Sequence, residues 1–444
     1  MTGPGLRTVT LGCKVNQYET EYVREGLLSA GYVDAEKGQP ADLCIVNTCT
    51  VTQSGDAKSR QTIRQLARRN PDARIIVMGC YATRAPEEVS QLPGVVEVVT
   101  DKRELPDLLG RHGVVDIPTG VSGFAQRHRA YLKVQDGCLL RCSFCIIPQV
   151  RPQMYSRQVE EIIAEAKRLI DRGFRELVLT GIHLGHYGVD FNRGKPKHEW
   201  TRLSHLVRAL VDLPGDFRIR LSSIEATEVT HELIEVLSEF PDRICPHLHI
   251  SMQSGSDAVL RRMRRRWGSE RFIDRCRLLK RVLDLPAITT DIIVGFPGET
   301  ENQFMETCAV AQEVGFSKIH IFPFSPRRGT SAANMSGQIA AQEKKARTRH
   351  LAKVEKTLAL DYFEKLCGKK LQVLFESVSE DSSRIIGTSC RYATVEVPSD
   401  EFACESNTLG TLCVVCAGEV MDGRIQASRI PVTDPGRMVG GGTR

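Results

Sequence analysis

Three cysteines in one short loop are the residues of this sequence best suited to chemistry. Cys138, Cys142 and Cys145, here the loop triad, have the spacing C-x3-C-x2-C and follow a strand-like run from Tyr131 to Gly137. Three thiolates can surround one iron–sulfur cube and leave its fourth iron without a protein ligand. Structural clusters usually have four cysteine ligands, so three predict a site that holds something else, as open catalytic metal sites do. Half of a zinc knuckle is the alternative, although zinc sites usually pair two C-x2-C halves.

A second set of three cysteines is spread over tens of residues but shares one local context. Cys13, Cys49 and Cys80, here the strand-end triad, each follow an apolar strand-like run. Ligands of open parallel sheets bind outside the carboxyl ends of the strands, so these thiols are expected to meet at one edge. Three unrelated packing residues are the alternative, because free cysteine is often buried. Cys44 lies inside the run Leu43 to Val46 and is predicted to belong to the core.

The elements that position the strand-end triad alternate between strand and helix patterns. Strands are predicted at 7–13, 42–50, 73–79 and 95–100, and helices at 17–30, 55–69 and 86–92. This alternation predicts an α/β fold with a doubly wound parallel sheet, residues 7–110. Asn16 is expected to cap the first helix, with Glu19 at its third position in a variant of the capping box.

Six further strand-and-helix repeats follow, and the loop triad comes after the first of their strands. These strands are predicted at 131–135, 176–180, 217–222, 247–252, 288–294 and 318–324. Eight such units would close a barrel. Six predict an incomplete (β/α)6 barrel, residues 124–355, that is open at its side and has room for a large substrate.

Small and polar residues follow several of these strands, on the rim where such barrels place their chemistry. The candidates for contact with a cofactor are Gly181, Ser222, Ser251, Gln253 and Gly295. Each of these residue types is common at strand ends. The prediction therefore depends on their joint position around one rim.

Two other groups have less specific interpretations. The run Arg261 to Arg266 contains five arginines, which predicts either a solvated helix face or a contact with a phosphate backbone. His183 and His186 lie in a glycine-rich loop and are predicted to be rim residues rather than metal ligands.

The C-terminal part predicts a charged helix, 342–366, followed by β-rich segments at 370–377, 384–397 and 411–420. Several short strands in about 65 residues, 367–430, fit a small β-barrel of the kind that grips RNA. Cys413 and Cys416 would point to opposite faces of a strand and make a poor chelate. They are grouped as packing or surface residues with the remaining cysteines, Cys245, Cys276, Cys308, Cys367, Cys390 and Cys404.

Length and composition limit the function classes. The chain has 444 residues, which predicts about three domains of ~150 residues, and its 41% hydrophobic and 26% charged residues are typical of a globular protein. No apolar run is long enough to span a membrane, and no secretory signal is evident, so a cytoplasmic location is expected. Fifteen cysteines then indicate metal binding or catalysis rather than disulfides. The net charge of +6 is compatible with a polyanionic partner.

The motifs resemble those of radical S-adenosylmethionine (SAM) enzymes, in which a phenylalanine such as Phe144 precedes the last cysteine of the loop. A loop triad after a three-cysteine domain resembles the methylthiotransferases. The string TLGCKVNQYET, 10–20, is similar to the branch that modifies N6-threonylcarbamoyladenosine in tRNA; related branches differ around that first cysteine. Further matches are NTCTVT (47–52), MGCYA (78–82), HLHISMQSGSD (247–257) and DIIVGFPGET (291–300). The resemblance runs from about Arg7 to Ser428 and ends in a TRAM-like RNA-binding module.

The resemblance implies two [4Fe-4S] clusters. The cluster on the loop triad would bind SAM at its open iron and cleave it reductively to a 5'-deoxyadenosyl radical, which removes hydrogen from C2 of the adenine. The cluster on the strand-end triad would hold or supply sulfur. The product would be 2-methylthio-N6-threonylcarbamoyladenosine next to the anticodon. The implied partners are tRNA, an electron donor similar to flavodoxin or ferredoxin, and a sulfur source, with no membrane.

Two alternatives remain open at this point. One is the same chemistry on isopentenyladenosine in tRNA or on a ribosomal protein, and the other is a non-catalytic RNA-binding protein with structural metal. One segment also departs from the family. After Pro148 the family commonly has an arginine–glycine pair and then Arg-Ser-Arg, whereas this chain has Pro152 after Arg151 and Tyr155 before Ser156. These differences do not affect the cysteines, and they are expected to change substrate contacts near this loop.

Overall fold

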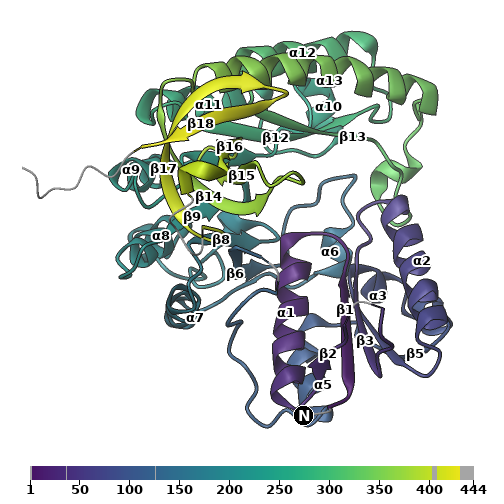
Figure 1. Ribbon diagram of the computed structural model, residues 1–444. Coiled ribbons are helices and arrows are strands. Elements are labelled where there is room, and N and C mark those ends of the chain that lie inside the picture. Colours follow the sequence, from purple (N-terminus) through teal and green to yellow (C-terminus); the bar gives the residue numbers. More distant parts are fainter. Residues whose placement is uncertain (1–2, 37, 126, 403–407, 431–444) are drawn as a thin grey trace, which may run out of the picture.

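The computed structural model describes residues 3–36, 38–125, 127–402 and 408–430, and Cys404 lies outside these residues. Three units follow one another along the chain (Figure 1): a parallel sheet with helices on both faces, an open half-barrel and a small closed barrel. The predicted fold class is confirmed. The boundaries 7–110, 124–355 and 367–430 stay predictions, and residue 355 falls inside a continuous helix, α13 (Ala341–Glu364).

The N-terminal sheet contains five parallel strands in the order β2-β1-β3-β4-β5. Their bounds are β1 Gly5–Thr10, β2 Val33–Asp34, β3 Leu43–Thr48, β4 Arg74–Gly79 and β5 Val95–Val98. The order 2-1-3-4-5 is one of the two common doubly wound topologies. Strands β1, β3 and β4, which precede the three cysteines of the strand-end triad, are therefore neighbours.

Helices cover both faces of this sheet. On one face, α1 (Lys14–Ser29) and α5 (Leu105–Arg111) pack on a core that includes Leu43 and Ile76. On the other face, α2 (Gln53–Arg69), α3 (Cys80–Arg84) and α4 (Pro86–Ser90) enclose a second core. Cys44 is fully buried in that second core, as predicted.

The predicted helix cap at Asn16 is wrong. Helix α1 begins at Lys14, and Cys13 is its N-cap residue. The Asn16 side chain lies inside the helix and donates from Nδ2 to the carbonyl oxygens of Leu11 and Thr48, over 2.9 and 3.0 Å. A partner on a neighbouring strand, which local sequence does not reveal, thus determines the role of Asn16.

The half-barrel is built from the six predicted strands. They are β6 Arg129–Asp136, β8 Glu176–Gly181, β9 Arg218–Leu221, β11 His247–Ile250, β12 Ala287–Val294 and β13 Lys318–Pro323. Neighbours in this order run parallel, and the short β10 (Ser223–Ile224) extends the line of β9 to pair with β11. Among the described strands, β6 and β13 do not pair with each other, so the barrel is open at its side. A short antiparallel strand, β7 (Tyr155–Ser156), is added beside β6.

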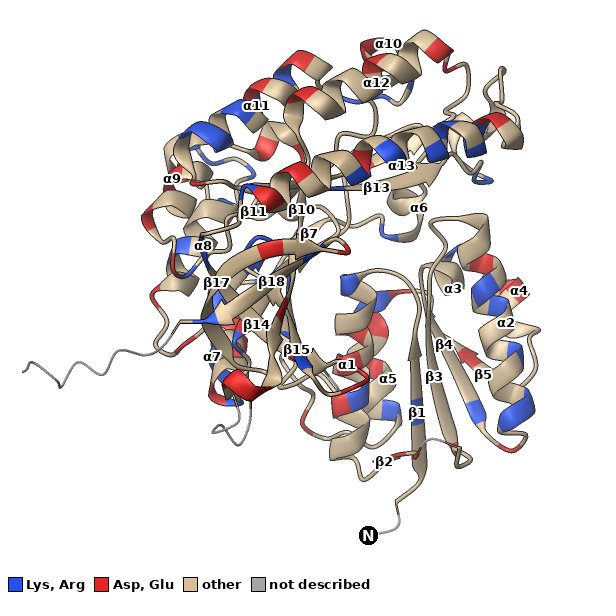
Figure 2. Ribbon diagram, turned by 45° about the horizontal axis from the view of Figure 1, so that its top comes forward, with Lys and Arg blue, Asp and Glu red and all other residues tan. Residues whose placement is uncertain are grey.

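Helices flank the half-barrel. They are α7 Val159–Asp171, α8 Leu203–Val211, α9 His231–Glu239, α11 Ser269–Val282 and α12 Glu301–Val314, with the shorter α6 Ile147–Val150 and α10 Asp257–Arg262 at the strand ends. Helix α13 lies against β13 and α12 (Figure 1) and carries charged residues of both signs along its length (Figure 2). In the described part of the chain, no helix is long and apolar enough to cross a membrane.

The C-terminal unit is a closed barrel with the strand order β14-β15-β16-β18-β17. Its strands are β14 Lys370–Val378, β15 Arg384–Ser389, β16 Thr394–Pro398, β17 Leu412–Met421 and β18 Arg424–Arg429. The segment predicted at 384–397 is two strands, and β18 was not predicted. Cys245, Cys276, Cys308 and Cys390 are buried, and Cys367, Cys413 and Cys416 are half-buried.

The C-terminal barrel is fastened to the half-barrel by a buried ion cluster. Glu176 of β8 accepts from Arg218 and Arg220 of β9, over 2.6 and 2.7 Å. The same arginines donate to backbone carbonyls of the C-terminal barrel, for example Arg218 to Thr388 over 2.8 Å. The small barrel therefore covers the inner side of strands β8 and β9.

Candidate functional site

The strand-end triad gathers at one edge of the N-terminal sheet. Cys13 follows β1, Cys49 follows β3, and Cys80 is the first residue of α3 directly after β4. Because these three strands are adjacent and parallel, their carboxyl ends lie side by side. The edge that the strand pattern predicts thus exists, and the role of the three thiols as metal ligands stays a prediction.

Two glycines make this edge possible. Gly12 and Gly79 precede Cys13 and Cys80, and both have a left-handed backbone, with φ of 99° and 98°. A Cβ at Gly12 would lie 2.9 Å from the Cβ and 3.1 Å from the Sγ of Cys49. A side chain at Gly12 would therefore fill the space beside the Cys49 thiol, and its absence leaves room there for a ligand.

Burial and neighbouring charges raise the pKa of two thiols of the strand-end triad. Desolvation raises the pKa of the Cys13 thiol, the Arg151 guanidinium opposes that rise, and the Cys80 thiolate reinforces it. Burial raises the pKa of the Cys49 thiol, and Cys80 again adds to the rise. Such an enclosure disfavours free thiolates, and a bound cation would compensate for their charge. The donor set fits an iron–sulfur cluster.

The loop triad lies at the carboxyl end of β6 and is held by contacts with the C-terminal end of α10. The Ser143 hydroxyl donates to the Arg262 carbonyl over 2.8 Å, and its backbone N–H donates to the Met263 carbonyl over 3.0 Å. Burial raises the pKa of Cys145 to about 12, and Cys142 and Cys138 contribute to that rise. The role of the three thiols as ligands of one cluster stays a prediction.

Arg265 is a member of this site that the sequence did not reveal. Its Nη1 lies 3.6 Å from the Sγ of Cys142, its Nη2 donates to the Ser251 carbonyl over 3.1 Å, and it forms an ion pair with Glu225. For Arg265 the predicted solvated or phosphate-contacting role is wrong, because the side chain turns inward to the loop triad. The inward direction of this side chain is evident from its distance to Cys142, and the spacing of the arginines in the sequence does not indicate it.

His183 and Glu228 flank the loop triad on another side. His183 Nδ1 lies 3.4 Å from Cys138 Sγ, and its Nε2 lies 2.5 Å from a Glu228 oxygen. His186 stacks on His183 with ring centroids 3.6 Å apart. Burial by itself lowers the pKa of His183, but Cys138 and Glu228 raise it to about 10. A protonated imidazole at Cys138 can donate to a thiolate, so we assign His183 to the surroundings of the loop triad.

The ligand atoms of His183, His186 and Glu228 all lie within 4.8 Å of one another. This closeness, which their positions in the loop did not indicate, is compatible with one small cation. That both histidines are rim residues rather than metal ligands stays a prediction.

Gly181 and Ser222 are two of the predicted cofactor contacts. A Cβ at Gly181 would lie 2.9 Å from the Gln135 Oε1, and Gln135 donates to the Gly137 carbonyl over 2.7 Å. Ser222 is 8% exposed, and its hydroxyl has no hydrogen-bond partner among the described residues. Buried hydroxyls in proteins nearly always have a partner, so Ser222 is available to a ligand on the rim.

The other three predicted cofactor contacts, Ser251, Gln253 and Gly295, also follow strands of the half-barrel, and their surroundings differ. Ser251 offers its carbonyl to Arg265. Gln253 has a left-handed backbone, with φ of 66°. The backbone N–H of Gly295 donates to Glu299 over 2.7 Å, and a Cβ there would lie 2.2 Å from the Lys344 side chain of α13. Contact of these residues with a cofactor stays a prediction.

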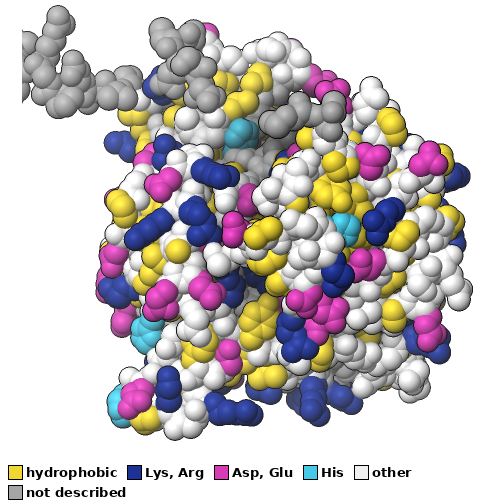
Figure 3. Space-filling model, turned by 90° about the horizontal axis from the view of Figure 1, so that it is seen from below, with side chains coloured by type: hydrophobic (Ala, Val, Ile, Leu, Met, Phe, Trp, Pro, Cys, Tyr) yellow, Lys and Arg dark blue, Asp and Glu magenta, His cyan; other side chains and the backbone are white. Residues whose placement is uncertain are grey.

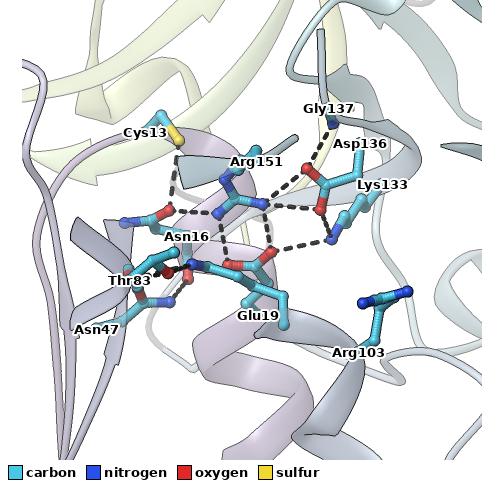
Figure 4. Close-up of polar contacts among 12 residues, drawn as sticks. Cys13, Asn16, Glu19, Asn47, Thr83, Arg103, Lys133, Asp136, Gly137 and Arg151 are labelled. Carbon is cyan, nitrogen blue, oxygen red and sulfur yellow. Dashed lines mark hydrogen bonds and ion pairs between the residues drawn. The ribbon is translucent and has the colours of Figure 1, made fainter. Parts of the chain in front are cut away.

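A buried ion cluster joins the two triads (Figure 4). Arg151 donates from Nη1 to Asp136 and Glu19 and from Nη2 to Glu19 and Asn16, over 2.7 to 2.9 Å. Asn16 in turn lies 3.7 Å from the Cys13 Sγ. Asp136 accepts from the Gly137 N–H over 2.7 Å, directly before the loop triad. Polar contacts therefore run without a break from one cysteine set to the other.

The charges of this cluster balance. Lys133 contacts Glu19 over 2.9 Å and Asp136 over 2.6 Å, so two cations face two carboxylates. Burial by itself raises the pKa of Glu19, but Arg151 and Lys133 hold it below its usual value, and the pKa of Asp136 is well below its usual range for the same reasons. Both carboxylates are therefore charged at neutral pH.

The residues that depart from the family lie beside this cluster. Pro152 is exposed, and the Tyr155 ring lies 5.8 Å from Lys133 Nζ. Both line a cavity of about 420 Å³ together with Lys102 and Arg103. The departure thus changes a cavity wall between the first two units and leaves the six cysteines in place.

Two family models match the chain. The Uncharacterized protein family UPF0004 matches residues 6–101, and the Radical SAM superfamily matches residues 132–311. The first range contains the strand-end triad and the second contains the loop triad.

The chain is also similar to curated proteins over most of its length. It is 42% identical over 407 residues to the threonylcarbamoyladenosine tRNA methylthiotransferase MtaB of Bacillus subtilis, covering 87% of this chain and 88% of that one. The protein of the same name from Thermotoga maritima is 39% identical over 384 residues, 84% and 86% of the two chains. The tRNA-2-methylthio-N(6)-dimethylallyladenosine synthase of Corynebacterium diphtheriae is 33% identical over 394 residues, 84% and 76%.

Solved structures with a similar fold include the radical S-adenosylmethionine methyltransferase TsrM from Kitasatospora setae with cobalamin and a [4Fe-4S] cluster bound. Its TM-score is 0.53 at 13% identity, covering 75% of this chain and 77% of that one. TsrM with tryptophan and a SAM analogue also has a TM-score of 0.53, at 14% identity and 83% and 78% coverage. At these identities the likeness concerns the fold alone.

Proposed function

The chain belongs to the threonylcarbamoyladenosine tRNA methylthiotransferases of the radical SAM superfamily, and we propose that its loop triad and its strand-end triad hold the two clusters of that reaction. The enzyme converts N6-threonylcarbamoyladenosine next to the anticodon of tRNA to its 2-methylthio derivative, with SAM and two [4Fe-4S] clusters as cofactors. The identity of 42% and 39% to the Bacillus subtilis and Thermotoga maritima proteins, against 33% to the Corynebacterium diphtheriae synthase, supports this substrate over the isopentenyladenosine alternative.

One observation carries the assignment of the clusters. Two sets of three cysteines lie at the carboxyl ends of two parallel sheets, and a single buried ion cluster around Arg151 connects them. Two separate metal sites for structure alone would not need such a connection. A reaction that makes a radical at one site and transfers sulfur from the other does need both sites to be held at a constant separation.

When bound, the clusters supply the electron for SAM cleavage and the sulfur for transfer. The residues of this chain hold and shield them. Arg265 and His183 place positive charge at the thiolates of Cys142 and Cys138, which favours the charged ligand form. The Ser222 hydroxyl is free to bind a polar group of SAM on the rim. Gly181 packs on Gln135 and thereby helps to shape the loop.

The remaining partners are part of the proposal. The tip of the cluster loop, Leu139 and Arg141, is exposed, which supports access by a small electron donor similar to flavodoxin or ferredoxin. The cavity lined by Lys102 and Arg103 supports entry of an anionic sulfur source beside the strand-end triad. Basic side chains, mixed with acidic ones, spread over the face shown in Figure 3, as expected of a protein that meets tRNA. We propose a cytoplasmic location, where tRNA is modified.

The iron content tests the two-cluster assignment. After anaerobic reconstitution we expect about eight irons per chain, and about four when the loop triad is changed to alanine. The corresponding change of the strand-end triad should also leave about four. A chain that retains all its iron after loss of the strand-end triad would contradict the assignment.

Mass spectrometry of tRNA nucleosides tests the substrate. A strain that lacks this protein should accumulate unmodified N6-threonylcarbamoyladenosine and lose the 2-methylthio derivative. If that pool does not change and another 2-methylthio nucleoside disappears instead, the enzyme acts on a different base.

A further inference from the structure

A pocket of about 400 Å³ lies where the three units of the chain meet. Tyr131 of β6 and Arg220 of β9 line it from the inner face of the half-barrel, and Lys14 reaches it from the first residue of α1. Tyr392, in the turn between β15 and β16, contributes from the C-terminal barrel, and Arg127 from the connection before β6. The pocket therefore exists only in the assembled chain.

Some of the positive charge around the pocket is neutralised by carboxylates. Arg129 forms an ion pair with Glu376 over 2.8 Å. Arg220 forms one with Glu176 over 2.7 Å, and its guanidinium lies 4.8 Å from the centre of the Tyr392 ring. These pairs hold the wall together.

Two further cations of the pocket, Lys14 and Arg127, have no carboxylate partner among the residues that the structure describes. Lys14 makes no hydrogen bond or ion pair with any residue in the described part of the chain, although it lines the pocket. Arg127 donates to the Tyr131 hydroxyl over 3.0 Å and pairs with no carboxylate among the described residues. The pocket thus has an excess of positive charge and is suited to an anion.

The charge of Lys14 acts on the interior of the half-barrel. Burial lowers the pKa of His247 well below its usual value, and Arg220, His249 and Lys14 lower it further. Burial likewise lowers the pKa of His320, with a contribution from Lys14. The two histidines are therefore neutral at physiological pH, and Lys14 is a cation without a counter-charge beside them.

Strand β6 connects the pocket to the loop triad. Tyr131 and Gln135 lie on this strand about 13 Å apart at ~3.3 Å per residue, and the strand has a register irregularity between Lys133 and Gln135. Gln135 accepts from the His183 N–H over 2.9 Å, and His183 contacts Cys138. On the other side, Lys14 directly follows Cys13. Strand β6 and His183 thus connect the pocket to the loop triad, and Lys14 connects it to the strand-end triad.

We propose that this pocket receives the threonylcarbamoyl group of the substrate adenosine and that Lys14 and Arg127 bind its carboxylate. This inference rests on the proposed function. The threonyl part of that group ends in a carboxylate, whereas an isopentenyl group or an unmodified N6 carries no charge. N6 is the exocyclic nitrogen on C6 of adenine, and C2 is another carbon of the same six-membered ring, so C2 can face the cysteine sets while the N6 group extends toward Lys14.

The proposal gives a physical reason for substrate selection. Hydrogen bonds between ionised groups are about twice as strong as neutral ones, and a site built for a polar group discriminates against analogues that lack it. Lys14 also lies within the string 10–20, the part of the sequence that resembles the threonylcarbamoyladenosine branch. A backbone phosphate of tRNA is the other anion that these cations could bind.

The test separates the two anions by measuring dissociation constants for three anticodon stem-loop RNAs. They carry N6-threonylcarbamoyladenosine, isopentenyladenosine or adenosine at the same position and are otherwise identical. The reconstituted full chain is compared with its Lys14→Gln and Arg127→Gln variants. We expect each variant to lose about tenfold in affinity for the first RNA and less than twofold for the other two, and Lys14→Arg to restore most of it.

Each alternative result has a definite meaning. An equal loss on all three RNAs would assign Lys14 and Arg127 to a phosphate and overturn the proposal, and unchanged affinities would also overturn it. Lys58→Gln, at an exposed position of α2, is the matched control and should bind all three RNAs like the wild type.

Two measurements distinguish a failure of this proposal from loss of a cluster and from a failure of the proposed function. The iron content of Lys14→Gln shows whether the neighbouring Cys13 still holds a cluster. If it does not, the test depends on Arg127→Gln, because Arg127 is not next to any cysteine in the sequence. A wild-type chain that prefers the first RNA but does not methylthiolate it would contradict the proposed function and leave the pocket assignment intact.

Discussion

Arg151 donates to both carboxylate oxygens of Glu19, over 2.7 and 2.8 Å, although one residue follows the loop triad and the other belongs to α1 of the N-terminal sheet. Removal of one partner of a buried ion pair typically costs about 3 to 5 kcal/mol, because the remaining charge is left without compensation. We therefore expect Arg151→Gln to lower the unfolding midpoint strongly, as urea unfolding followed by circular dichroism can measure. Arg141→Gln, at an exposed position, should have no such effect. An unchanged midpoint for Arg151→Gln would show that the cluster does not hold the two units together.

Gly12→Ala should remove one cluster and leave the other. The substitution places a Cβ 2.9 Å from Cys49 and forces alanine into a left-handed backbone, which is unfavourable by about 1 to 2 kcal/mol. Iron analysis should find about four irons per chain instead of about eight. Gly110→Ala is the control, because a Cβ there meets no atom within 4 Å in helix α5. A fully loaded Gly12→Ala chain would mean that the strand-end triad tolerates the side chain.

Arg265 and Arg261 should affect different properties. Arg265 lies 3.6 Å from Cys142, so Arg265→Gln removes a positive charge from the surroundings of the loop cluster. Its reduction potential should fall by on the order of 100 mV, from Coulomb's law at an effective dielectric constant of about 20, as a redox titration followed by electron paramagnetic resonance can show.

Arg261 is exposed on α10 and tests the hypothesis that this run contacts phosphate. Arg261→Gln should leave the reduction potential unchanged and reduce the salt dependence of tRNA binding by about one released counterion. If Arg265→Gln alters the salt dependence and Arg261→Gln alters the potential, the two assignments are reversed.

The contact between the half-barrel and the C-terminal barrel should weaken in acid. Burial by itself raises the pKa of Glu176, but Arg220 and Arg218 hold it well below its usual range. A carboxyl group whose pKa is lowered by folding stabilises the folded state when the pH is above its unfolded pKa of about 4.3. This stabilisation is lost as the pH falls below that value. We expect the unfolding midpoint to be constant from about pH 8 to 5 and to decrease below about pH 4.

Glu176→Gln provides the comparison for this pH dependence. The variant should be less stable than the wild type at neutral pH, because Arg218 and Arg220 lose their counter-charge. It should also show a shallower loss of stability in acid, since one titrating carboxyl is gone. Parallel acid curves for the two proteins would assign the acid sensitivity to other carboxylates.

Local patterns were sufficient for much of the fold. All six strands of the half-barrel lie where the apolar runs predict them, and Cys13, Cys49 and Cys80 do follow strands. These features can be predicted from neighbouring residues, because apolar side chains repeat with a period of two residues in a strand and with a longer period in a helix. The strand β18 was missed, because Arg424–Arg429 is short and polar.

Contacts between distant segments were not predictable in this way. Asn16 binds the Thr48 carbonyl instead of capping its helix, and Arg265 turns inward to Cys142 instead of facing solvent. The spacing of residues along one helix does not indicate where a partner on another element lies. The same holds for Tyr392, which reaches the pocket from the C-terminal barrel.

The sequence by itself determined the chemistry of this protein, because two sets of three cysteines and the motifs around them specify thiolate ligands and a family of reactions. Only the tertiary structure decided how those sets are related. It placed β1, β3 and β4 side by side, set Arg151 between the triads and turned Lys14 into a pocket shared by three units. The reason is physical: a residue type defines which bonds a side chain can form, and packing of distant segments defines which partner it meets.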